Sequence, residues 1–411
     1  MANTLIAGGG IGGLAAALSI ARAGTNDPHR VTVLERGDRF AELGAGIQLA
    51  PNAFRALDLL GVGDRVRERA VFIDELRLMD GTTGRRVTGL PLTGTYRERF
   101  GNPYAVVHRG DLYQPLLDAC RADGRIELLP GHAVTGYTQT ADKVVVTSRI
   151  AGKVTADGRT TGSGTVTRFE ADYLIGADGI RSAVRAQLVG DGRPRVSGHT
   201  IHRSVIPMER VPEELRWNVV TLWAGPKWHF VHYPIGGGAF LNLAATVDDG
   251  ATREVAGEPV AREVVRNRFP GLSDTARALL ALGDEWRTWV LCDRDPVSAW
   301  TDGRVALLGD AAHPMLQYAA QGACTALEDA VVLGDVFPDL DAYAALRRER
   351  TADATRAARW LGDRIYHPAG EAARERNGML AALSETDLHD HVAWLHAYNP
   401  RTERIPSDAV R

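Results

Sequence analysis

Apolar residues along this 411-residue chain occur in two spacings, and each spacing predicts a different kind of element. Short continuous apolar runs indicate buried strands at 4–7, 31–34, 171–175 and 305–308, and helical patterns follow the first, third and fourth of them. Strands alternating with helices are typical of a parallel sheet that is covered by helices. The sequence therefore predicts an α/β fold with a Rossmann-like domain.

The intervening stretches show other patterns, which interrupt this domain. Residues 70–100 alternate around Asp80-Gly81 as a β-ribbon does, 126–170 predict a β-meander, and 197–245 predict aromatic-rich strands. Helical patterns return at 258–283 and 340–380, and a short tail closes the chain. We expect a discontinuous first domain at 1–70, 100–125, 170–190 and 297–335. An inserted mixed-sheet domain at 71–99 and 191–296 and a C-terminal helical region at 336–411 complete the prediction.

A glycine-rich turn follows the first strand. Gly8-x-Gly10-x-x-Gly13 lies between that strand and a helix that we expect to end at Gly24, and Glu35 ends the second strand. In this motif the first glycine allows the tight turn, the second lets a pyrophosphate approach the backbone, and the third lets helix and strand pack closely. An acidic residue about 20 positions further on accepts ribose hydroxyls. This combination predicts dinucleotide binding.

Two later strands also end in turns that carry a carboxylate. Asp178-Gly179 follows the strand at 171–175, and Gly309-Asp310 follows the strand at 305–308. Ligands of open α/β sheets bind at this edge, where the Asp310 carboxylate suits a polyol hydroxyl. Further on, Gly322 and Ala323 are small enough to leave backbone N–H groups accessible to a ring carbonyl or an anion. Asp178-Gly179 has a plainer alternative as a strand-ending turn.

Composition excludes several other classes of function. The net charge of −3 lacks the basic footprint of a nucleic-acid-binding protein, and the chain has no apolar run of 18 residues. Cys120, Cys292 and Cys324 form no metal-ligand pattern and are expected to be reduced core residues. We expect a cytoplasmic protein with no membrane span, no metal site and no nucleic-acid partner.

The three motifs in this order resemble those of the single-component, FAD-dependent aromatic hydroxylases, and the resemblance covers nearly the whole chain. It implies FAD as the bound cofactor, and NADH or NADPH as a reductant that binds transiently, with NADH preferred. It also implies a set of cofactor-binding residues: Gly8, Gly10, Gly13, Glu35, Arg36, Arg109, Asp178, Asp310, Pro314, Gly322 and Ala323. The alternative to cofactor binding by Arg109 is membership of a surface ion pair.

Within the family, the stretches at 44–53, 225–235 and 313–330 resemble the salicylate and 3-hydroxybenzoate hydroxylase branch. The text after His313-Pro314 departs from the salicylate type, which favours the 3-hydroxybenzoate 6-hydroxylase type. That resemblance implies His229 and Gln317 as catalytic residues at the substrate phenol, and Tyr233 and Gln48 as substrate-binding residues. The expected reaction is hydroxylation of a phenolic aromatic acid with NAD(P)H and O₂, from 3-hydroxybenzoate to gentisate.

Other functions stay open. Within the family, they are salicylate 1-hydroxylation and a biosynthetic hydroxylation of a related aromatic acid; outside it, they are a non-catalytic FAD-binding module and a plain NAD-dependent dehydrogenase. The charged C-terminal helices are compatible with a homodimer and equally with a solvated face.

His229 suits the role of a base because the unperturbed pKa of histidine is about 6.5 and a phenol reacts better as its phenolate. Gln317 has both donors and an acceptor for the same oxygen. The alternative for His229 is a buried core histidine. On an alternating strand His229 and Tyr233 share one face, and His232 lies on the other.

Overall fold

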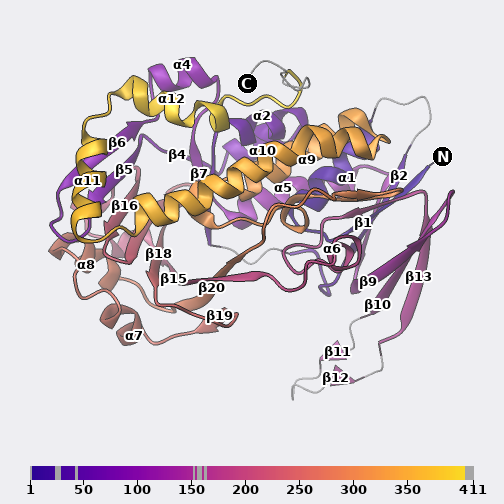
Figure 1. Ribbon diagram of the computed structural model, residues 1–411, viewed down its shortest axis with the longest axis horizontal. Helices are drawn as coiled ribbons and strands as arrows, with labels where there is room; N and C mark the ends of the chain where they lie inside the picture. The colour runs from indigo at the N-terminus through magenta and orange to yellow at the C-terminus, as the bar shows by residue number, and fades with distance from the viewer. Residues whose placement is uncertain are drawn as a thin grey trace.

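The computed structural model describes residues 2–23, 29–41, 45–150, 153–154, 160–161 and 164–402. Two large sheets dominate it, and the long helix α10 (Leu340–Leu361) runs across both (Figure 1). Gly24, Gly44 and the end of the expected helical region at 403–411 lie outside the described residues. Within these ranges the fold is the predicted α/β class.

The first large sheet has six strands in the order β21-β22-β14-β1-β2-β8. All neighbours are parallel except the edge pair β21–β22. In chain order the strands are β1 (Asn3–Ala7), β2 (Arg30–Glu35), β8 (Ile126–Pro130), β14 (Tyr173–Gly176), β21 (Thr301–Asp302) and β22 (Val305–Leu307). From β1 the chain continues to β2 on one side, while β14 lies on the other side of β1. The gap beside β1 is therefore the topological switch point, where such sheets bind ligands.

Small residues let the helices over this sheet pack closely. Helix α1 (Ile11–Arg22) lies against α9 (Gly322–Val336) and α5 (Arg109–Ala122). A Cβ atom on Gly334 of α9 would lie 2.5 Å from the Ser19 Cβ atom, and one on Gly12 would lie 2.9 Å from a Leu308 methyl group. A larger residue at Gly334 would therefore push α1 and α9 apart, and one at Gly12 would displace Leu308.

The second large sheet has eight strands in the order β19-β20-β15-β18-β17-β16-β5-β6. Its neighbours are antiparallel except for the parallel pair β5–β16. The strands are β5 (Glu75–Asp80), β6 (Arg86–Pro91), β15 (Arg195–Pro207), β16 (Val219–Gly225), β17 (Trp228–Ile235), β18 (Phe240–Asp248), β19 (Ala256–Pro259) and β20 (Arg287–Asp293). The expected β-ribbon at 70–100 is the pair β5–β6.

One face of this sheet packs on two helices, α7 (Arg262–Asn267) and α8 (Asp274–Ala281). Trp228 and Phe230 of β17 join Phe269 and Leu279 in a core cluster on that face. Because side chains alternate along a strand, His229, Val231 and Tyr233 face the other way, toward the parallel sheet. Val231 and Tyr233 pack accordingly with the core of the parallel sheet.

The remaining elements are short connections or cover the two large sheets. Helices α2 (Pro51–Leu59) and α3 (Gly63–Arg67) precede the inserted strands, whereas α4 (Thr95–Phe100) and α6 (Ala183–Leu188) lie between β6 and β15 along the chain. Helices α11 (Gly370–Ala381) and α12 (Glu385–His396) follow α10. The smaller sheets have the orders β3-β7-β4, β13-β10-β9 and β11-β12. Their strands are β3 (Gly46–Leu49), β4 (Val71–Phe72), β7 (Ala105–His108), β9 (His132–Gln139), β10 (Val144–Ile150), β11 (Lys153–Val154), β12 (Thr160–Thr161) and β13 (Val166–Ala171).

One prediction from the apolar pattern was wrong in detail. Within the expected meander, β9, β10 and β13 form one antiparallel sheet and β11 and β12 form another, while β8 pairs in parallel with β2. The reason is helix α5, which precedes β8 and returns the chain to the same edge, as a crossover helix does. Helix α12 lies in the expected C-terminal helical region and runs into the expected short tail; it starts at a capping box made by Ser384 and Asp387.

A buried ion network ties α9 to α10. Glu328 and Asp329, in the middle of α9, have no solvent exposure. Arg347 of α10 donates to Glu328 at 2.6 Å and to Asp329 at 2.7 Å, and Arg350 donates twice to Glu328 at 2.8 Å. Although burial opposes ionisation, the charges of His313 and Arg347 lower the pKa of Asp329 to about 2. The network thus keeps charged carboxylates inside the protein.

We expect Arg347→Met to lower the free energy of unfolding by about 3–5 kcal/mol, because it leaves two buried carboxylates short of a partner. Arg348→Met is the matched control, since Arg348 is exposed and should cost no more than about 0.5 kcal/mol. Urea unfolding followed by circular dichroism measures both variants. Equal losses for the two would contradict the role of the network.

Candidate active site

The carboxyl ends of four parallel strands meet at one edge of the six-stranded sheet. Ala7 of β1 pairs with Leu34 of β2 on one side and with Gly176 of β14 on the other, and Gly176 pairs with Leu307 of β22. The predicted motifs come directly after these residues. The register therefore brings the glycine turn, Glu35, Asp178 and Asp310 to the same edge.

The glycine turn leaves room where a ligand backbone contact is expected. A Cβ atom on Gly8, whose φ is +103°, would lie 2.3 Å from the Ala177 carbonyl oxygen, and one on Gly13 would lie 2.0 Å from the Gly8 carbonyl oxygen. A Cβ atom on Gly10 would meet nothing within 4 Å. Gly8 and Gly13 thus fit the close packing of the turn, while Gly10 borders open space, as a pyrophosphate approach requires.

Glu35 supports the glycine turn with its own carboxylate. One oxygen accepts from the Gly9 N–H at 2.9 Å and the other from the Gly37 N–H at 2.7 Å. Tyr113 of α5 donates to the Gly9 carbonyl oxygen at 2.9 Å. Each carboxylate oxygen can accept a further bond, so Glu35 keeps the capacity to bind ribose. Arg36, the next residue, is exposed.

Asp178 caps a helix in this structure. Its carboxylate accepts from the Ser182 hydroxyl and from the Ala183 N–H at 2.7 Å, at the start of α6. Burial raises the pKa of Asp178, while these hydrogen bonds oppose the rise. This arrangement fits the alternative given above, in which Asp178-Gly179 is a strand-ending turn. Cofactor binding by Asp178 stays a prediction.

Asp310 lies beside the first turn of α9. Its side chain is exposed, and one carboxylate oxygen is 3.9 Å from where a Gly322 Cβ would stand. Gly322 and Ala323 begin α9, so their N–H groups belong to the positive end of that helix. Pro314 is buried and its carbonyl oxygen accepts from the Arg294 N–H at 3.3 Å. A carboxylate for hydroxyl groups and a helix end for negative charge thus lie together, which fits FAD.

His229 is buried on the side of β17 that faces the parallel sheet. Its Nδ1 atom lies 2.8 Å from the Nε2 atom of His367, which follows the π-helical turn η5 (Gly362–Tyr366), and the two rings stack. The rings of Tyr318 and Tyr366 also pack on His229, at centroid distances of 5.5 and 4.8 Å. The Tyr318 hydroxyl forms a 2.5 Å hydrogen bond with Nδ1 of His199.

Burial keeps these histidines neutral. It lowers the pKa of His229 well below 6.5, and the neighbouring His367 and His199 lower it further. The pKa of His367 falls to about 3 for the same reasons, burial first and then His199. A neutral imidazole has one donor and one acceptor nitrogen, so His229 can take a proton at one nitrogen while the other bonds to His367.

Gln317 and Tyr233 have partners of their own. Arg203 of β15 donates from Nη2 to Oε1 of Gln317 at 2.6 Å. Burial raises the pKa of Tyr233 to about 12, although Arg203 and a hydrogen bond with Gln48 oppose the rise. The Oε1 atom of Gln48 also accepts from the Tyr104 hydroxyl at 2.6 Å.

The predicted substrate-side residues therefore lie in separate contacts. Tyr233 meets Gln48 directly, whereas Gln317 contacts Arg203 and His229 contacts His367. Arg109, at the start of α5, lies close enough to lower the pKa of Arg203. The sequence reasoning missed Arg203, His199, Tyr318, Tyr366 and His367. From the sequence, only Arg203 and His199 could have been predicted to share a face. They lie an even number of residues apart on one alternating strand.

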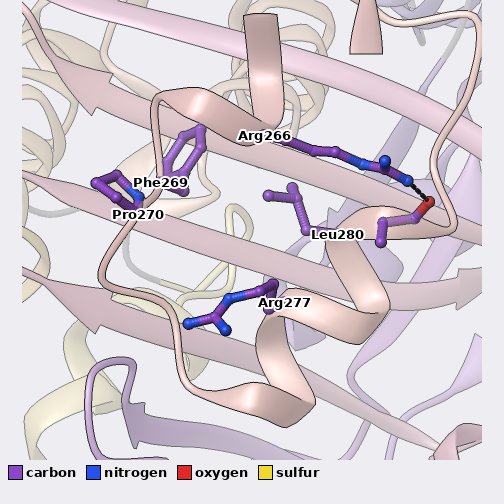
Figure 2. A pocket seen from close by; sticks show the side chains of 6 residues that line it. Arg266, Phe269, Pro270, Arg277 and Leu280 are labelled. Atoms are coloured by element: carbon purple, nitrogen blue, oxygen red, sulfur yellow. Dashed lines mark hydrogen bonds between the residues drawn. The ribbon is translucent and has the colours of Figure 1, made fainter. Parts of the chain in front are cut away.

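A surface hollow lies between α7 and α8, away from these residues. Figure 2 shows its lining, including Phe269, Arg277 and Leu280, and the 2.8 Å hydrogen bond from Arg266 to the Ala281 carbonyl oxygen. It lies on the opposite side of the eight-stranded sheet from His229. We therefore assign it no part in the site.

A search of the described ranges finds no group of three or more His, Cys, Asp or Glu side chains that could hold a metal ion. None of the helices in those ranges is long and apolar enough to cross a membrane.

Comparison with known proteins gives a consistent result. Residues 1–349 match the family model described as FAD binding domain. The chain is 45% identical to 3-hydroxybenzoate 6-hydroxylase 1 of Aquipseudomonas alcaligenes, covering 96% of this chain and 97% of the relative. It is 40% identical to the 3-hydroxybenzoate 6-hydroxylase of Polaromonas naphthalenivorans (strain CJ2), covering 96% of each. The solved HpxO of Klebsiella pneumoniae, complexed with FAD and uric acid, is 26% identical with a TM-score of 0.77 and 95% coverage of both chains.

We expect Gly10→Ala to weaken FAD binding by about tenfold or more, equivalent to about 1.4 kcal/mol, because the new methyl group fills the open space beside the turn. Fluorescence titration of the apoprotein measures the affinity. Its stability should not change, since φ of Gly10 is −74° and a Cβ there meets nothing. Gly124→Ala, in similarly open space away from the site, is the control. Unchanged FAD affinity in Gly10→Ala would remove the turn from the cofactor site.

Proposed function

This chain belongs to the FAD-binding-domain family and is an FAD-dependent aromatic monooxygenase, and from that premise we propose that it converts 3-hydroxybenzoate to gentisate. One O₂ and one NADH with a proton are consumed, and the products are gentisate, NAD⁺ and water. The observation that carries the proposal is the buried, neutral His229, which faces the parallel sheet and is hydrogen-bonded to His367. The 40–45% identity to enzymes named for this reaction supports it.

The residues at the strand edge fit FAD. We propose that the glycine turn (Gly8, Gly10 and Gly13) with Glu35 and Arg36 holds the adenosine and pyrophosphate part. Arg109 would contact the diphosphate region, Asp178 would serve FAD as well, and Asp310 would bind hydroxyl groups. Gly322 and Ala323 would direct their N–H groups toward the flavin ring, with Pro314 near it. When bound, FAD supplies the redox chemistry that takes electrons from the reductant and activates O₂.

The protein's own task is to raise the electron density of the substrate ring. Neutral His229 accepts the hydrogen bond of the phenol hydroxyl at one ring nitrogen and takes up its proton as the ring reacts. The hydrogen on Nδ1 is then donated to Nε2 of His367, which helps to stabilise the imidazolium. Tyr318 and Tyr366 pack around this pair and exclude water.

Gln317 would act on the same substrate oxygen as a donor. Arginine has no acceptor atom, so the amide group of Gln317 must turn its oxygen toward Arg203. The amide N–H groups remain for the substrate. A donor favours the phenolate, which accepts hydrogen bonds more strongly than the neutral phenol.

The finer parts of this function are proposals too. We propose NADH rather than NADPH as the reductant and Tyr233 and Gln48 as substrate-binding residues. The division into domains at the boundaries given above, the cytoplasmic location and the homodimer stay predictions.

The reaction is tested by screening the purified holoenzyme with 3-hydroxybenzoate, salicylate and 3-amino-4-hydroxybenzoate. We expect 3-hydroxybenzoate to stimulate NADH oxidation and O₂ uptake most, with gentisate as the product found by chromatography. Parallel assays with NADPH test the choice of reductant. Turnover of salicylate alone, or no coupled oxidation at all, would contradict the proposal.

His229→Gln should lower the rate of hydroxylation by about 100-fold or more, since general bases contribute about 10²–10⁴-fold. NADH oxidation should continue and release hydrogen peroxide, and the FAD content should not change. His232→Gln is the matched control, because His232 is equally buried on the same strand but faces the other side of the sheet. Unchanged hydroxylation in His229→Gln would leave His229 as a core residue.

A further inference from the structure

Helix α10 ends in the π-helical turn η5, and His367 follows that turn directly. Turns of this kind are rare and frequently lie at functional sites. The turn also lies beyond residues 1–349, which match the FAD-binding-domain model. It nevertheless reaches the substrate side of the molecule, where Tyr366 and His367 pack on His229 and Tyr318.

The first contact of this segment fixes the ring of His229. Nε2 of His367 lies 2.8 Å from Nδ1 of His229, and the two rings stack with 27° between their planes. The backbone holds His367 in turn, because its carbonyl oxygen accepts from the Lys227 N–H at 3.1 Å and its own N–H donates to the Gly362 carbonyl oxygen at 3.2 Å. A bond at Nδ1 decides which nitrogen of His229 carries the hydrogen and leaves Nε2 for another partner.

A second contact supports the short turn that carries Gln317. This turn, η4 (Gln317–Ala319), is followed by Ala320 at φ +51°, a left-handed conformation that is strained for alanine. The Tyr366 hydroxyl donates to the Tyr318 carbonyl oxygen at 3.0 Å, in the middle of η4. Strained backbone persists only where the surrounding structure holds it, and η5 supplies such a contact.

Gly362 allows the two turns to approach each other closely. A Cβ atom on Gly362 would lie 2.7 Å from Cε2 of Tyr318, closer than a real Cβ atom comes to its neighbours. The Tyr318 hydroxyl also bonds to Nδ1 of His199 at 2.5 Å. The Tyr318 ring is therefore fixed between η5 and β15, and Gln317 is the residue next to it.

We propose that η5 is the positioning element of the substrate site and that it holds both residues that act on the phenol. It holds His229 through His367, and it holds Gln317 through Tyr366. The inference deepens the proposed function and rests on it for the roles of His229 and Gln317. His367 and Tyr366 are positioning residues, because each acts through a neighbouring residue. The same short turn therefore sets where the two groups at the phenol stand relative to each other.

This placement gives a C-terminal segment a share in substrate recognition. The predicted cofactor residues all lie within residues 1–349, whereas the geometry at the phenol depends on a turn that follows them. A change in η5 should therefore weaken recognition of the hydroxyl group and leave FAD bound.

Two ligands that differ by one hydroxyl group test the turn without turnover. Benzoate and 3-hydroxybenzoate are each titrated into the holoenzyme without NADH, while the flavin absorbance is followed. The Kd of benzoate divided by the Kd of 3-hydroxybenzoate measures the contribution of the hydroxyl group, because every other contact cancels. In the wild type we expect a ratio of about ten or more, as for one or two hydrogen bonds.

Tyr366→Phe removes one hydroxyl group and keeps the ring. We expect the ratio to fall by about threefold, as for loss of one neutral hydrogen bond. Tyr343→Phe is the matched control, because Tyr343 is a buried tyrosine of α10 whose hydroxyl donates to the Leu307 carbonyl oxygen at 3.1 Å. This variant should keep the wild-type ratio.

His367→Phe keeps a stacked ring without a nitrogen for His229 and should lower the ratio by about tenfold. His367→Gln restores a side chain that forms hydrogen bonds and should recover part of it. Gly362→Ala should lower the ratio by displacing Tyr318, and Gly378→Ala, where a Cβ atom would meet nothing within 4 Å, is its control. The FAD content and thermal unfolding of each variant show whether the fold has survived.

The outcomes separate this proposal from the proposed reaction. A lower ratio in both Tyr366→Phe and His367→Phe supports the role of η5, even if 3-hydroxybenzoate is not turned over. An unchanged ratio in either variant would overturn the joint role, even if gentisate is formed. A wild-type ratio near one would also overturn it, since the site would then not recognise the hydroxyl group. If His367→Phe loses FAD, His367→Gln takes its place, and its ratio must lie below that of the wild type.

Discussion

The charges buried in helix α9 are the constraint on which the rest of the structure depends. Two adjacent carboxylates, Glu328 and Asp329, lie inside the protein and stay ionised because α10 supplies Arg347 and Arg350 and because His313 lies beside Asp329. The same carboxylates bind groups from other segments. Asn52 of α2 donates to Glu328 at 2.6 Å, and the Gly309 N–H donates to Asp329 at 3.1 Å. One network therefore holds the end of β22, the start of the Asp310 turn and the helix whose first residues face the proposed cofactor.

The second constraint is the alternation of side chains in the eight-stranded sheet. Along β17, the even-numbered residues fill the core under α7 and α8, while His229 and Tyr233 face the parallel sheet. A shift of one residue in register would exchange these two sets. The tryptophan and phenylalanine side chains of the core, Trp228 and Phe230, therefore help to hold the histidine in place.

The local part of this structure could be predicted from the sequence. The glycine turn, its helix and Glu35 lie within one strand–helix–strand unit, so spacing along the chain was enough to predict them. The contacts of the site could not be predicted in this way. His229 and His367 are 138 residues apart, and Arg203 and Gln317 are 114 apart. Which pairs meet depends on strand register and on the path of α10. Asp178 shows that a residue predicted to bind the cofactor can also cap a helix.

Backbone carbonyl groups near the end of α12 accept hydrogen bonds from arginines that lie much earlier in the chain. Arg55 of α2 donates to the carbonyl oxygens of His396 and Tyr398, and the Arg55–His396 contact spans 341 residues. Arg350, which pairs with Glu328, also donates to the carbonyl oxygens of Trp394 and Leu395. Arg55 and Arg350 therefore gain these backbone partners only once residues 394–398 have been made. This part of the fold is completed late in synthesis, although α2 is made early.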